Sequence, residues 1–226
     1  MLYDIVIPHY GSGHLTDLCL RCLVTIRAHS KDYRVILVDN ASPERDLILD
    51  ELQQHPHLLV SNSENVGFIR ATNQGIALST SPHVVLLNND CEAVPGWLEK
   101  LRGGFDAHPS VGIVGPLTTT PESWQGKWNP RPGVQVLAPG RMLAFFCAMF
   151  KREVFEKVGL LDESYGPGLG DDDAFCRSAE QAGFRIALVQ DLRIPHAHRS
   201  TFKAIYSSEE IKEMQKVAMA KFRSEA

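Results

Sequence analysis

The chain is 226 residues long, with 44% hydrophobic and 22% charged residues. That length and balance are typical of one compact globular domain with a sizeable core, and they exclude disordered, collagen-like and coiled-coil proteins. The formal net charge of −4 provides no broad basic face, so we expect no binding to nucleic acid.

The sequence contains no candidate membrane-spanning segment. No apolar run approaches the roughly 18 to 20 residues that cross a bilayer. The opening residues MLYDIVIPHY lack the basic-then-apolar order of a secretory signal. We therefore expect a cytoplasmic protein, with peripheral association with a membrane left open.

Five cysteines, an odd number, do not make a disulfide framework in a chain of this size. Cys19 and Cys22 have the spacing of a redox or zinc motif, but both fall on the apolar stripe of an expected helix. No second cysteine pair completes a zinc site. We expect reduced thiols and interpret Cys19 and Cys22 as small core residues.

The first half of the chain alternates short apolar runs with helical patterns. The runs are rich in β-branched residues and have the length of strands that are buried on both faces. Such alternation favours βαβ units and a mainly parallel sheet. The expected strands cover residues 3–8, 34–38, 58–60, 84–87 and 111–114, and the expected helices cover residues 15–26, 43–54, 69–79 and 97–108.

The regular alternation ends after residue 116. The proline-rich segment 117–140 has little periodicity, and loops this long inside a compact domain are usually functional or mobile. A glycine-rich stretch, residues 165–170, leads into three aspartates that open a helix. The other expected elements are strands at residues 142–150 and 185–189 and helices at residues 152–158, 171–182 and 207–222.

Polar residues collect where three of the expected strands end. His9 follows the first strand, Asp39 ends the second, and the sequence Asn-Asn-Asp at residues 88–90 follows the fourth. Ligands of parallel sheets bind beyond the carboxyl ends of the strands. A carboxylate such as that of Asp90 can hold a hard divalent cation and leave positions free for a diphosphate. The alternative is an aspartate that caps the following turn.

Eight short motifs follow one another over nearly the whole chain: IVIPHY, VDNAS, ENVGFIRATNQGI, LLNNDCEAVPGWLEKL, VGIVGP, VFEKVGLLDE, GDDDAFCRSAEQAGF and PHAHRST. In this order they resemble the inverting family 2 glycosyltransferases of the GT-A fold. The resemblance implies an α/β fold, with a Rossmann-like, mainly parallel central sheet flanked by helices and a smaller antiparallel portion on the acceptor side. It also implies a single domain over residues 1–226, with a nucleotide-sugar half at 1–116 and an acceptor and catalytic half at 117–226.

The resemblance implies which residues hold the donor. Asp39, from the VDNAS motif, would accept a hydrogen bond from the base of a uridine or thymidine nucleotide. Arg70 and Asn73 would help to hold the base or the phosphates. The other residues implied to contact the nucleotide are Pro8, His9, Tyr10 and Asn89.

Metal binding is implied for Asp90, which matches the last position of the family's metal-binding triplet, usually D-x-D. This chain departs from that pattern by having Asn88 at the first position. His196, in the closing motif, is the better match to a second metal ligand, while His198 is more readily interpreted as a surface residue. Neutral imidazole is a competent ligand for Mn²⁺ and a poorer one for Mg²⁺, and either ion is the expected cofactor.

The catalytic base is implied to lie among the aspartates at residues 171–173, which align with the family's Glu-Asp pair. A gapless register places the base at Asp172, whereas a register through Arg177 places it at Asp171. A helix N-terminus favours anions by roughly 0.3 to 1 kcal/mol each, but three exceed what capping needs. Repulsion raises the pKa of such a group and the helix dipole lowers it, so the net shift is left open.

The proline-rich segment contains Trp124 and Trp128, which either stack on a sugar ring of the acceptor or hold the loop in place. Both interpretations are kept.

The residues and the resemblance together predict a metal-dependent transferase. It would move a sugar from a UDP- or dTDP-sugar to a hydroxyl of a glycan or another acceptor, with inversion of the anomeric centre. The similarity to soluble bacterial transferases of cell-surface glycans, including rhamnosyl-type enzymes, implies polysaccharide synthesis. The alternatives are a noncatalytic nucleotide-sugar-binding module and a sugar nucleotidyltransferase, although the latter usually begins with a basic glycine-rich loop and residues 9–14 contain neither Lys nor Arg.

Overall fold

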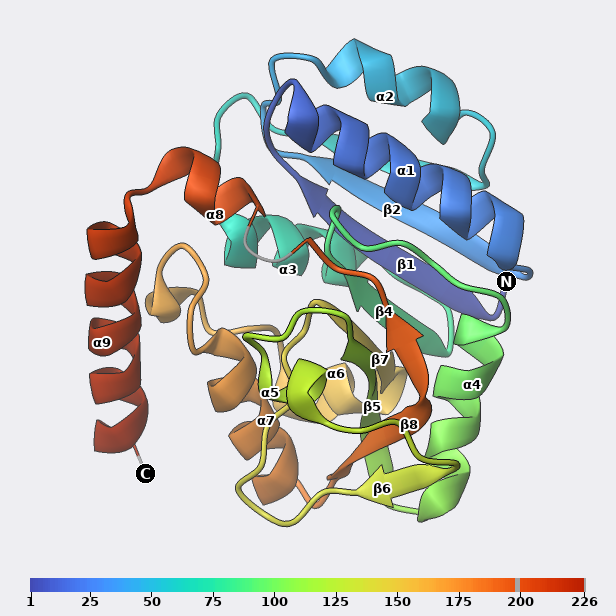
Figure 1. Cartoon of the computed structure of the whole chain (residues 1–226), viewed down its shortest axis with the longest axis vertical. Helices are drawn as coiled ribbons and strands as arrows, with labels where there is room; N and C mark the ends of the chain where they lie inside the picture. Colours follow the sequence, from blue (N-terminus) through green and yellow to red (C-terminus); the bar gives the residue numbers. More distant parts are fainter. Residues whose placement is uncertain (198–199, 226) are drawn as a thin grey trace.

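The computed structural model describes residues 1–197 and 200–225, and within them one sheet of eight strands forms the centre of the molecule (Figure 1). The strands lie in the order β3-β2-β1-β4-β7-β5-β8-β6. The four strands of the first half are mutually parallel, and they are β1 (Tyr3–His9), β2 (Tyr33–Asp39), β3 (His57–Ser61) and β4 (His83–Leu87).

The sheet changes direction at β7, which is antiparallel to both β4 and β5. β5 and β8 are parallel to one another, and β6 pairs with β8 in the antiparallel sense. The sheet is therefore mainly parallel with a smaller antiparallel portion, which confirms the predicted fold class. The strands of this second half are β5 (Val111–Thr118), β6 (Val134–Val136), β7 (Cys147–Lys151) and β8 (Arg185–Ile194).

Helices cover both faces of the sheet, and β1 shows why. Tyr3, Ile5 and Ile7 pack into a core cluster on one face, whereas Val6 packs into a second cluster on the other, because successive side chains of a strand point to opposite faces. The first cluster is covered by α1 (His14–His29), α2 (Arg45–Leu52) and α4 (Trp97–Gly103), and the second by α3 (Phe68–Leu78), α6 (Arg152–Val158) and α7 (Asp171–Gln181).

Two helices follow β8, and they are α8 (Ser200–Ile205) and α9 (Ser208–Ser224). α9 lies along one side of the molecule, at the left in Figure 1. Its N-terminus is closed by a capping box between Ser207 and Glu210, which satisfies backbone N–H groups that the helix itself leaves unpaired. Among the described residues, no helix is both long and apolar enough to cross a membrane.

Four expected elements differ from the structure by four or more residues at one end. The expected strand at 111–114 extends as β5 to Thr118. The expected strand at 142–150 begins only at Cys147, as β7. Leu143 and Phe145 lie before it and are apolar because they are buried in the second core cluster. The expected strand at 185–189 extends as β8 to Ile194, and the expected helix at 97–108 is α4 followed by a 3₁₀ helix, η1 (Gly104–Ala107). The short elements that were not predicted are β6, α8, α5 (Trp124–Lys127) and the 3₁₀ helix η2 (Glu163–Tyr165).

The cysteines are buried and free, as expected. Cys19 and Cys22 lie on α1 and pack into the first core cluster. Burial raises the pKa of both thiols, so neither forms the thiolate that metal or redox chemistry needs. The interpretation of this pair as core residues is confirmed.

Candidate active site

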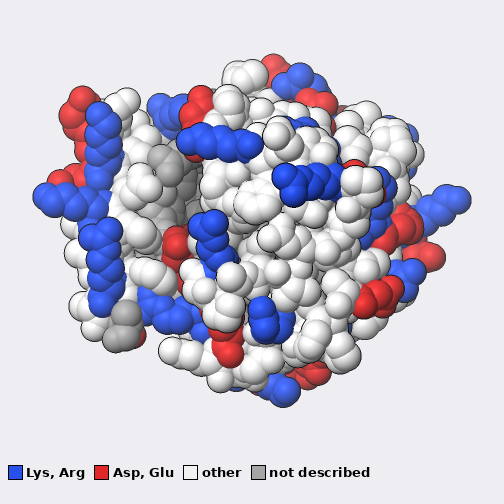
Figure 2. All heavy atoms as spheres, turned by 60° about the horizontal axis from the view of Figure 1, so that its bottom comes forward, with Lys and Arg blue, Asp and Glu red and all other residues white. Residues whose placement is uncertain are grey.

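A cavity of about 520 Å³ opens at the carboxyl ends of β1, β2 and β4. One wall consists of the loops that follow these strands, and the opposite wall comes from the glycine-rich loop before α7 and from α8 and α9. Figure 2 shows a hollow beside the column of side chains at the left, where α9 lies in Figure 1. The predicted site residues that line it are Pro8, His9, Tyr10, Asn89, Asp90, Trp124, Asp171, Asp172 and His196.

Asp90 and His196 are brought together by backbone pairing. The turn after β4 and the segment after β8 form an antiparallel bridge between Cys91 and His196. The Glu92 N–H donates to the Pro195 carbonyl at 3.0 Å, and the Ala197 N–H donates to the Asp90 carbonyl at 3.1 Å. This pairing fixes two segments that lie about a hundred residues apart in the chain.

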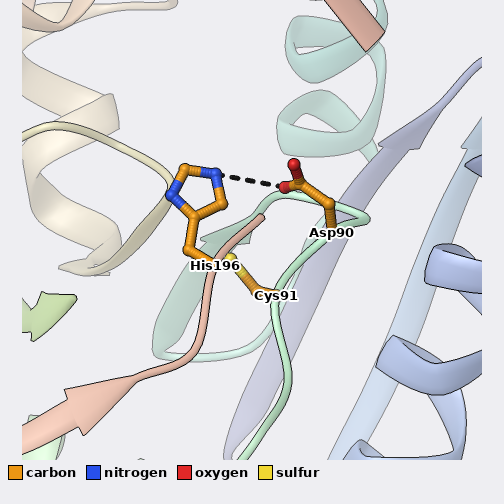
Figure 3. Close-up of side chains that lie close together, drawn as sticks. All are labelled: Asp90, Cys91 and His196. Atoms are coloured by element: carbon orange, nitrogen blue, oxygen red, sulfur yellow. Dashed lines mark ion pairs between the residues drawn. The ribbon is translucent and has the colours of Figure 1, made fainter. Parts of the chain in front are cut away.

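The side chains of Asp90 and His196 point toward one another (Figure 3). The Asp90 Oδ1 atom lies 3.1 Å from the His196 Nε2 atom, and both side chains are about 95% buried. Burial alone would raise the pKa of Asp90, but the contact with His196 and the hydrogen bonds from Ser200 together outweigh it, so the pKa lies below the usual carboxyl range. Asp90 is therefore an anion at neutral pH.

The pair fits two ligands of one small divalent cation. Oxygen and imidazole ligands lie roughly 2.0 to 2.2 Å from such ions, so two adjacent ligands are about 3 Å apart. The observed 3.1 Å between Asp90 Oδ1 and His196 Nε2 matches that separation, and both side chains are buried. The Asn88 amide also reaches this place, with its Nδ2 atom 3.4 Å from His196 Nε2.

Cys91 contributes a third potential donor atom to this cluster. Its Sγ atom, however, donates to the Phe146 carbonyl at 3.3 Å, and burial raises the thiol pKa well above its ordinary value. The Phe146 ring also stacks on the His196 imidazole, with centroids 4.9 Å apart. Cys91 is thus a protonated thiol that helps to seat the His196 ring, and Asp90 and His196 are the two candidate ligands.

His9 and Asn89 form a buried hydrogen-bonded pair, and both residues line the cavity. The Asn89 amide lies 2.7 Å from the His9 Nδ1 atom, and burial lowers the pKa of His9 to about 4. The imidazole is neutral at physiological pH. Asp39 is the register partner of His9 across β1 and β2, but it is buried and accepts a hydrogen bond from the Ser42 N–H at 3.2 Å.

The three aspartates open α7 directly after Gly170, which has a left-handed φ of 87°. Asp171 is buried, Asp172 and Asp173 are half-buried, and all three line the cavity. Burial, reinforced by the charge on Asp173, raises the pKa of Asp171 to about 6. Burial and the charges of both neighbours raise the pKa of Asp172 as well, so desolvation and mutual repulsion outweigh the hydrogen bonds that the carboxylate accepts from the backbone.

Some predicted site residues lie elsewhere. Among the described residues that line the cavity, Asp39, Arg70, Asn73 and Trp128 do not occur. Trp128 packs edge-to-face against Trp124, with ring centroids 6.0 Å apart, so one tryptophan borders the cavity and the other supports it. His198 lies outside the described residues.

Sequence reasoning missed several lining residues. Asn40 lines the cavity, and its side chain connects the loops after β2 and β3 by donating to Asn65 Oδ1 at 2.6 Å. Its place next to Asp39 in VDNAS was an available signal. Phe202 and Tyr206 also line the cavity from the α8 region, with centroids 5.7 Å apart. Their four-residue spacing was the only local signal, and it does not identify a cavity wall.

The sequence model named Glycosyl transferase family 2 matches residues 4–159 of the chain. The match includes the loops after β1, β2 and β4 and ends before α7. It therefore covers Asp90 and leaves the aspartates of α7 and His196 outside.

A curated relative is a glucosyl-dolichyl phosphate glucuronosyltransferase of Haloferax volcanii. It is 26% identical over 182 residues, which are 72% of this chain and 58% of the relative. The chain thus spans less than two thirds of the length of this relative.

Two solved structures share the fold. A mannosyltransferase from Pyrobaculum calidifontis, in complex with GDP-Man and Mn²⁺, superposes with a TM-score of 0.69 and 21% identity, covering 87% of this chain and 56% of that one. S. aureus TarS in complex with UDP-GlcNAc gives a TM-score of 0.69 and 14% identity, covering 96% of this chain and 65% of that one. At these identities the likeness shows the GT-A architecture alone.

Proposed function

Because this chain belongs to glycosyl transferase family 2, we propose that it transfers a sugar from a nucleoside diphosphate donor to an acceptor hydroxyl with inversion of the anomeric centre. The observation that carries the proposal is that one cavity is lined both by two candidate metal ligands, Asp90 and His196, and by the carboxylates of residues 171–173. A metal ion held by Asp90 and His196 would neutralise the donor diphosphate. A carboxylate among residues 171–173 would accept the proton of the attacking hydroxyl.

The donor is a UDP- or dTDP-sugar in this proposal. Pro8, His9 and Tyr10 line the cavity at the end of β1, where nucleotides bind in parallel sheets. Asp39 lies next to His9 on the neighbouring strand, and its carboxylate would accept the imide N–H of uracil or thymine. The two solved relatives were found with a guanosine and a uridine nucleotide sugar respectively, so the choice of base is a property of the individual chain.

The transferase depends on Mn²⁺ or Mg²⁺ in this proposal, with Asp90 and His196 as the protein ligands. When bound, the ion offsets the negative charge that develops on the departing diphosphate. The imidazole favours Mn²⁺ over Mg²⁺. His196 is kept in orientation by the stacked Phe146 ring.

Asp172 takes the proton of the acceptor hydroxyl, and Asp171 is the alternative base. The acceptor oxygen bonds to the anomeric carbon while the bond from that carbon to the diphosphate oxygen breaks, and the electron pair leaves with the diphosphate. The hydroxyl proton passes to the carboxylate. A raised pKa makes an aspartate a stronger base than it is in water.

The acceptor enters on the side of the cavity formed by Trp124, with Trp128 behind it, and by α8 and α9. Aromatic rings suit the apolar faces of a sugar. A glycan or another hydroxyl compound of cell-surface polysaccharide synthesis, in the cytoplasm, is the proposed setting. The proposed division of labour places donor binding in residues 1–116 and acceptor binding in residues 117–226.

A thermal-shift screen with UDP, dTDP and GDP, each with and without Mn²⁺, tests the donor proposal, because a ligand that binds the folded state raises its melting temperature. UDP or dTDP with Mn²⁺ should stabilise the protein most, and Asp39→Ala should weaken this effect by about 1 to 3 kcal/mol. Equal stabilisation by GDP would contradict the assignment of the base.

A further inference from the structure

The first turns of α3 lie beside the segment that leads into α7, although Asn73 and Leu161 are 88 residues apart in the sequence. We infer that Asn73, Arg70 and Glu163 form a clamp that positions the catalytic carboxylates, and that Asn73 and Arg70 act without touching the donor. This inference rests on the proposed function, because it takes the base to lie at the start of α7.

Asn73 holds the backbone of Leu161 from both sides. Its Nδ2 atom donates to the Leu161 carbonyl at 2.9 Å, and its Oδ1 atom accepts from the Leu161 N–H at 3.0 Å. The same Nδ2 atom donates to Oε1 of Glu163 at 3.2 Å. Asn73 is 5% exposed, so both amide hydrogens and the carbonyl are committed to this segment in a buried place.

Glu163 joins the two residues of α3. Its Oε1 atom accepts from Asn73, and its Oε2 atom accepts from Arg70 Nε at 3.0 Å. Arg70 and Asn73 are three residues apart and therefore lie on the same face of the helix. The Arg70 and Glu163 side chains are 64% and 45% exposed, and an exposed pair stabilises a fold only weakly. The ion pair with Arg70 therefore serves to orient the Glu163 carboxylate, which also accepts a hydrogen bond from the buried Asn73 amide.

The contact continues toward the carboxylates. The Phe68 N–H donates to the Pro167 carbonyl at 3.3 Å. Gly168 lies so close to Phe68 that an added Cβ would be 3.0 Å from the Phe68 Cδ1 atom. α3 therefore touches the segment from Leu161 to Gly168, just ahead of Asp171.

This segment depends on outside anchors for its shape. Gly166, Gly168 and Gly170 all have positive φ angles, and glycine allows the backbone more conformations than any other residue. The aspartates follow Gly170 directly, so a displaced loop displaces them. A shift of about 1 Å in a catalytic group can lower the rate about 100-fold.

Arg70 and Asn73 are absent from the described residues that line the cavity. Their side chains are instead engaged with Glu163 and with the backbone of Leu161. Their effect on the reaction therefore passes through the loop, and the two positions are positioning residues.

A double-mutant cycle of Arg70→Ala and Glu163→Ala separates the clamp from a phosphate contact. Glu163 carries a negative charge and cannot attract a diphosphate, so Glu163→Ala is the matched control. Both single variants should lower kcat at saturating donor by a similar factor, about 3- to 10-fold, and the double variant should be no slower than either. Binding of UDP or dTDP, whichever stabilises the wild type, should change by less than about twofold.

The opposite pattern would overturn the inference. If Arg70→Ala weakened nucleotide binding by about tenfold while Glu163→Ala bound normally, Arg70 would be a donor contact. Additive losses of kcat in the double variant would also exclude a shared clamp.

Asn73→Ala tests the buried half of the clamp. We expect kcat to fall about 10- to 100-fold with nucleotide affinity retained, and faster amide exchange at residues 161–170 with β1 to β4 still protected. Unchanged exchange at 161–170 would contradict the clamp. The exchange measurement needs no substrate and therefore tests the clamp independently of activity. If the wild type transferred no sugar, the proposed function would be refuted, but the exchange at residues 161–170 would still decide whether the clamp exists. Should Asn73→Ala fail to fold, the exposed pair Arg70 and Glu163 still decides the question.

Discussion

Asp90 and Cys91 are neighbours in the sequence and both contribute an atom to the cluster with His196, yet their environments give them different chemistry. The pKa of the carboxyl is lowered, despite burial, by the facing imidazole and by hydrogen bonds from Ser200, whereas burial raises the pKa of the thiol. Only a deprotonated group binds a cation well. The structure therefore favours an ion held by oxygen and imidazole.

Asp90→Asn should abolish the effect of Mn²⁺ on nucleotide binding, because the amide lacks the charge that holds a hard cation. Cys91→Ala is the matched control from the same cluster. It should cost about 1 kcal/mol of stability through the lost contact with Phe146 and should keep the Mn²⁺ response. Calorimetric titration of nucleotide with and without Mn²⁺ measures both. Loss of the response in Cys91→Ala would instead identify a thiolate ligand.

Asp172→Asn should lower turnover by about 10² to 10⁴ while nucleotide binding survives, because the substitution is nearly isosteric and removes only the base. Asn substitutions at 171 and 173 serve as comparisons at the same helix N-terminus. The measurement is transfer rate alongside nucleotide affinity for all three variants. Near-normal turnover in Asp172→Asn, with turnover lost in Asp171→Asn, would move the base by one residue.

The raised pKa of Asp171 also predicts how stability depends on pH. Its folded-state pKa of about 6 exceeds the ordinary aspartate value, so the folded protein holds this proton more tightly than the unfolded chain. The group's contribution to the free energy of unfolding therefore falls as pH rises from about 4 to 6. Asp171→Asn should raise the stability by about 1 to 3 kcal/mol at pH 8 and leave it unchanged near pH 3.5. Thermal unfolding at both pH values tests this, and equal shifts would contradict it.

At the scale of elements, the helices and strands that the sequence predicted correctly are those with a clear pattern of apolar residues. β1, β2, β4, α1 and α3 were foreseen because each buries a continuous run or a clear stripe of apolar side chains. β6 and α8 were not foreseen, since a strand of three residues and a helix without buried residues leave no periodic pattern. The prediction of strand at residues 142–146 was wrong, because burial without strand pairing gives the same apolar run as a strand.

The glycine that opens α7 offers a test at this scale. Gly170 has a φ of 87° and lies against Met219, whereas Gly183, just past the other end of α7, has a φ of 91° and open space where a Cβ would lie. An alanine at either position should cost roughly 1 to 2 kcal/mol through backbone strain.

Only Gly170→Ala should also lower kcat, by about tenfold or more, because it alone adjoins the carboxylates. Gly183→Ala is the control for the shared loss of stability. Turnover that fell equally in the two variants would show that strain in α7, and not the placement of its first residues, limits the rate.

At the scale of the whole molecule, the two halves of the sheet meet at β4 and β7, and the cavity lies over this junction. The turn after β4 supplies Asp90, and the segment after β8 returns to pair with it. The candidate pair of metal ligands, Asp90 and His196, is therefore assembled from both halves. The described parts of α8 and α9 complete the wall with Phe202, Tyr206 and Met219.

The sequence predicted residues of the site whose role depends on local position, such as Asp90 at a strand end and the aspartates at a helix start. It could not predict contacts made across the fold. Asn73 binds Leu161 on another element, and nothing near Asn73 in the sequence indicates that partner. Asp39 was placed at a strand end correctly, but its burial beneath the loop depends on packing that the pattern does not specify.

The central claim is metal-dependent transfer of a sugar from a nucleotide donor, and release of nucleoside diphosphate tests it most directly. A panel of UDP- and dTDP-sugars is incubated with the protein in Mn²⁺ or in excess EDTA, alongside Asp90→Asn and Asp172→Asn. We predict that at least one donor releases its nucleoside diphosphate in Mn²⁺, and that EDTA and either substitution suppress the release. Full release in EDTA, or no release from any nucleotide sugar, would contradict the account.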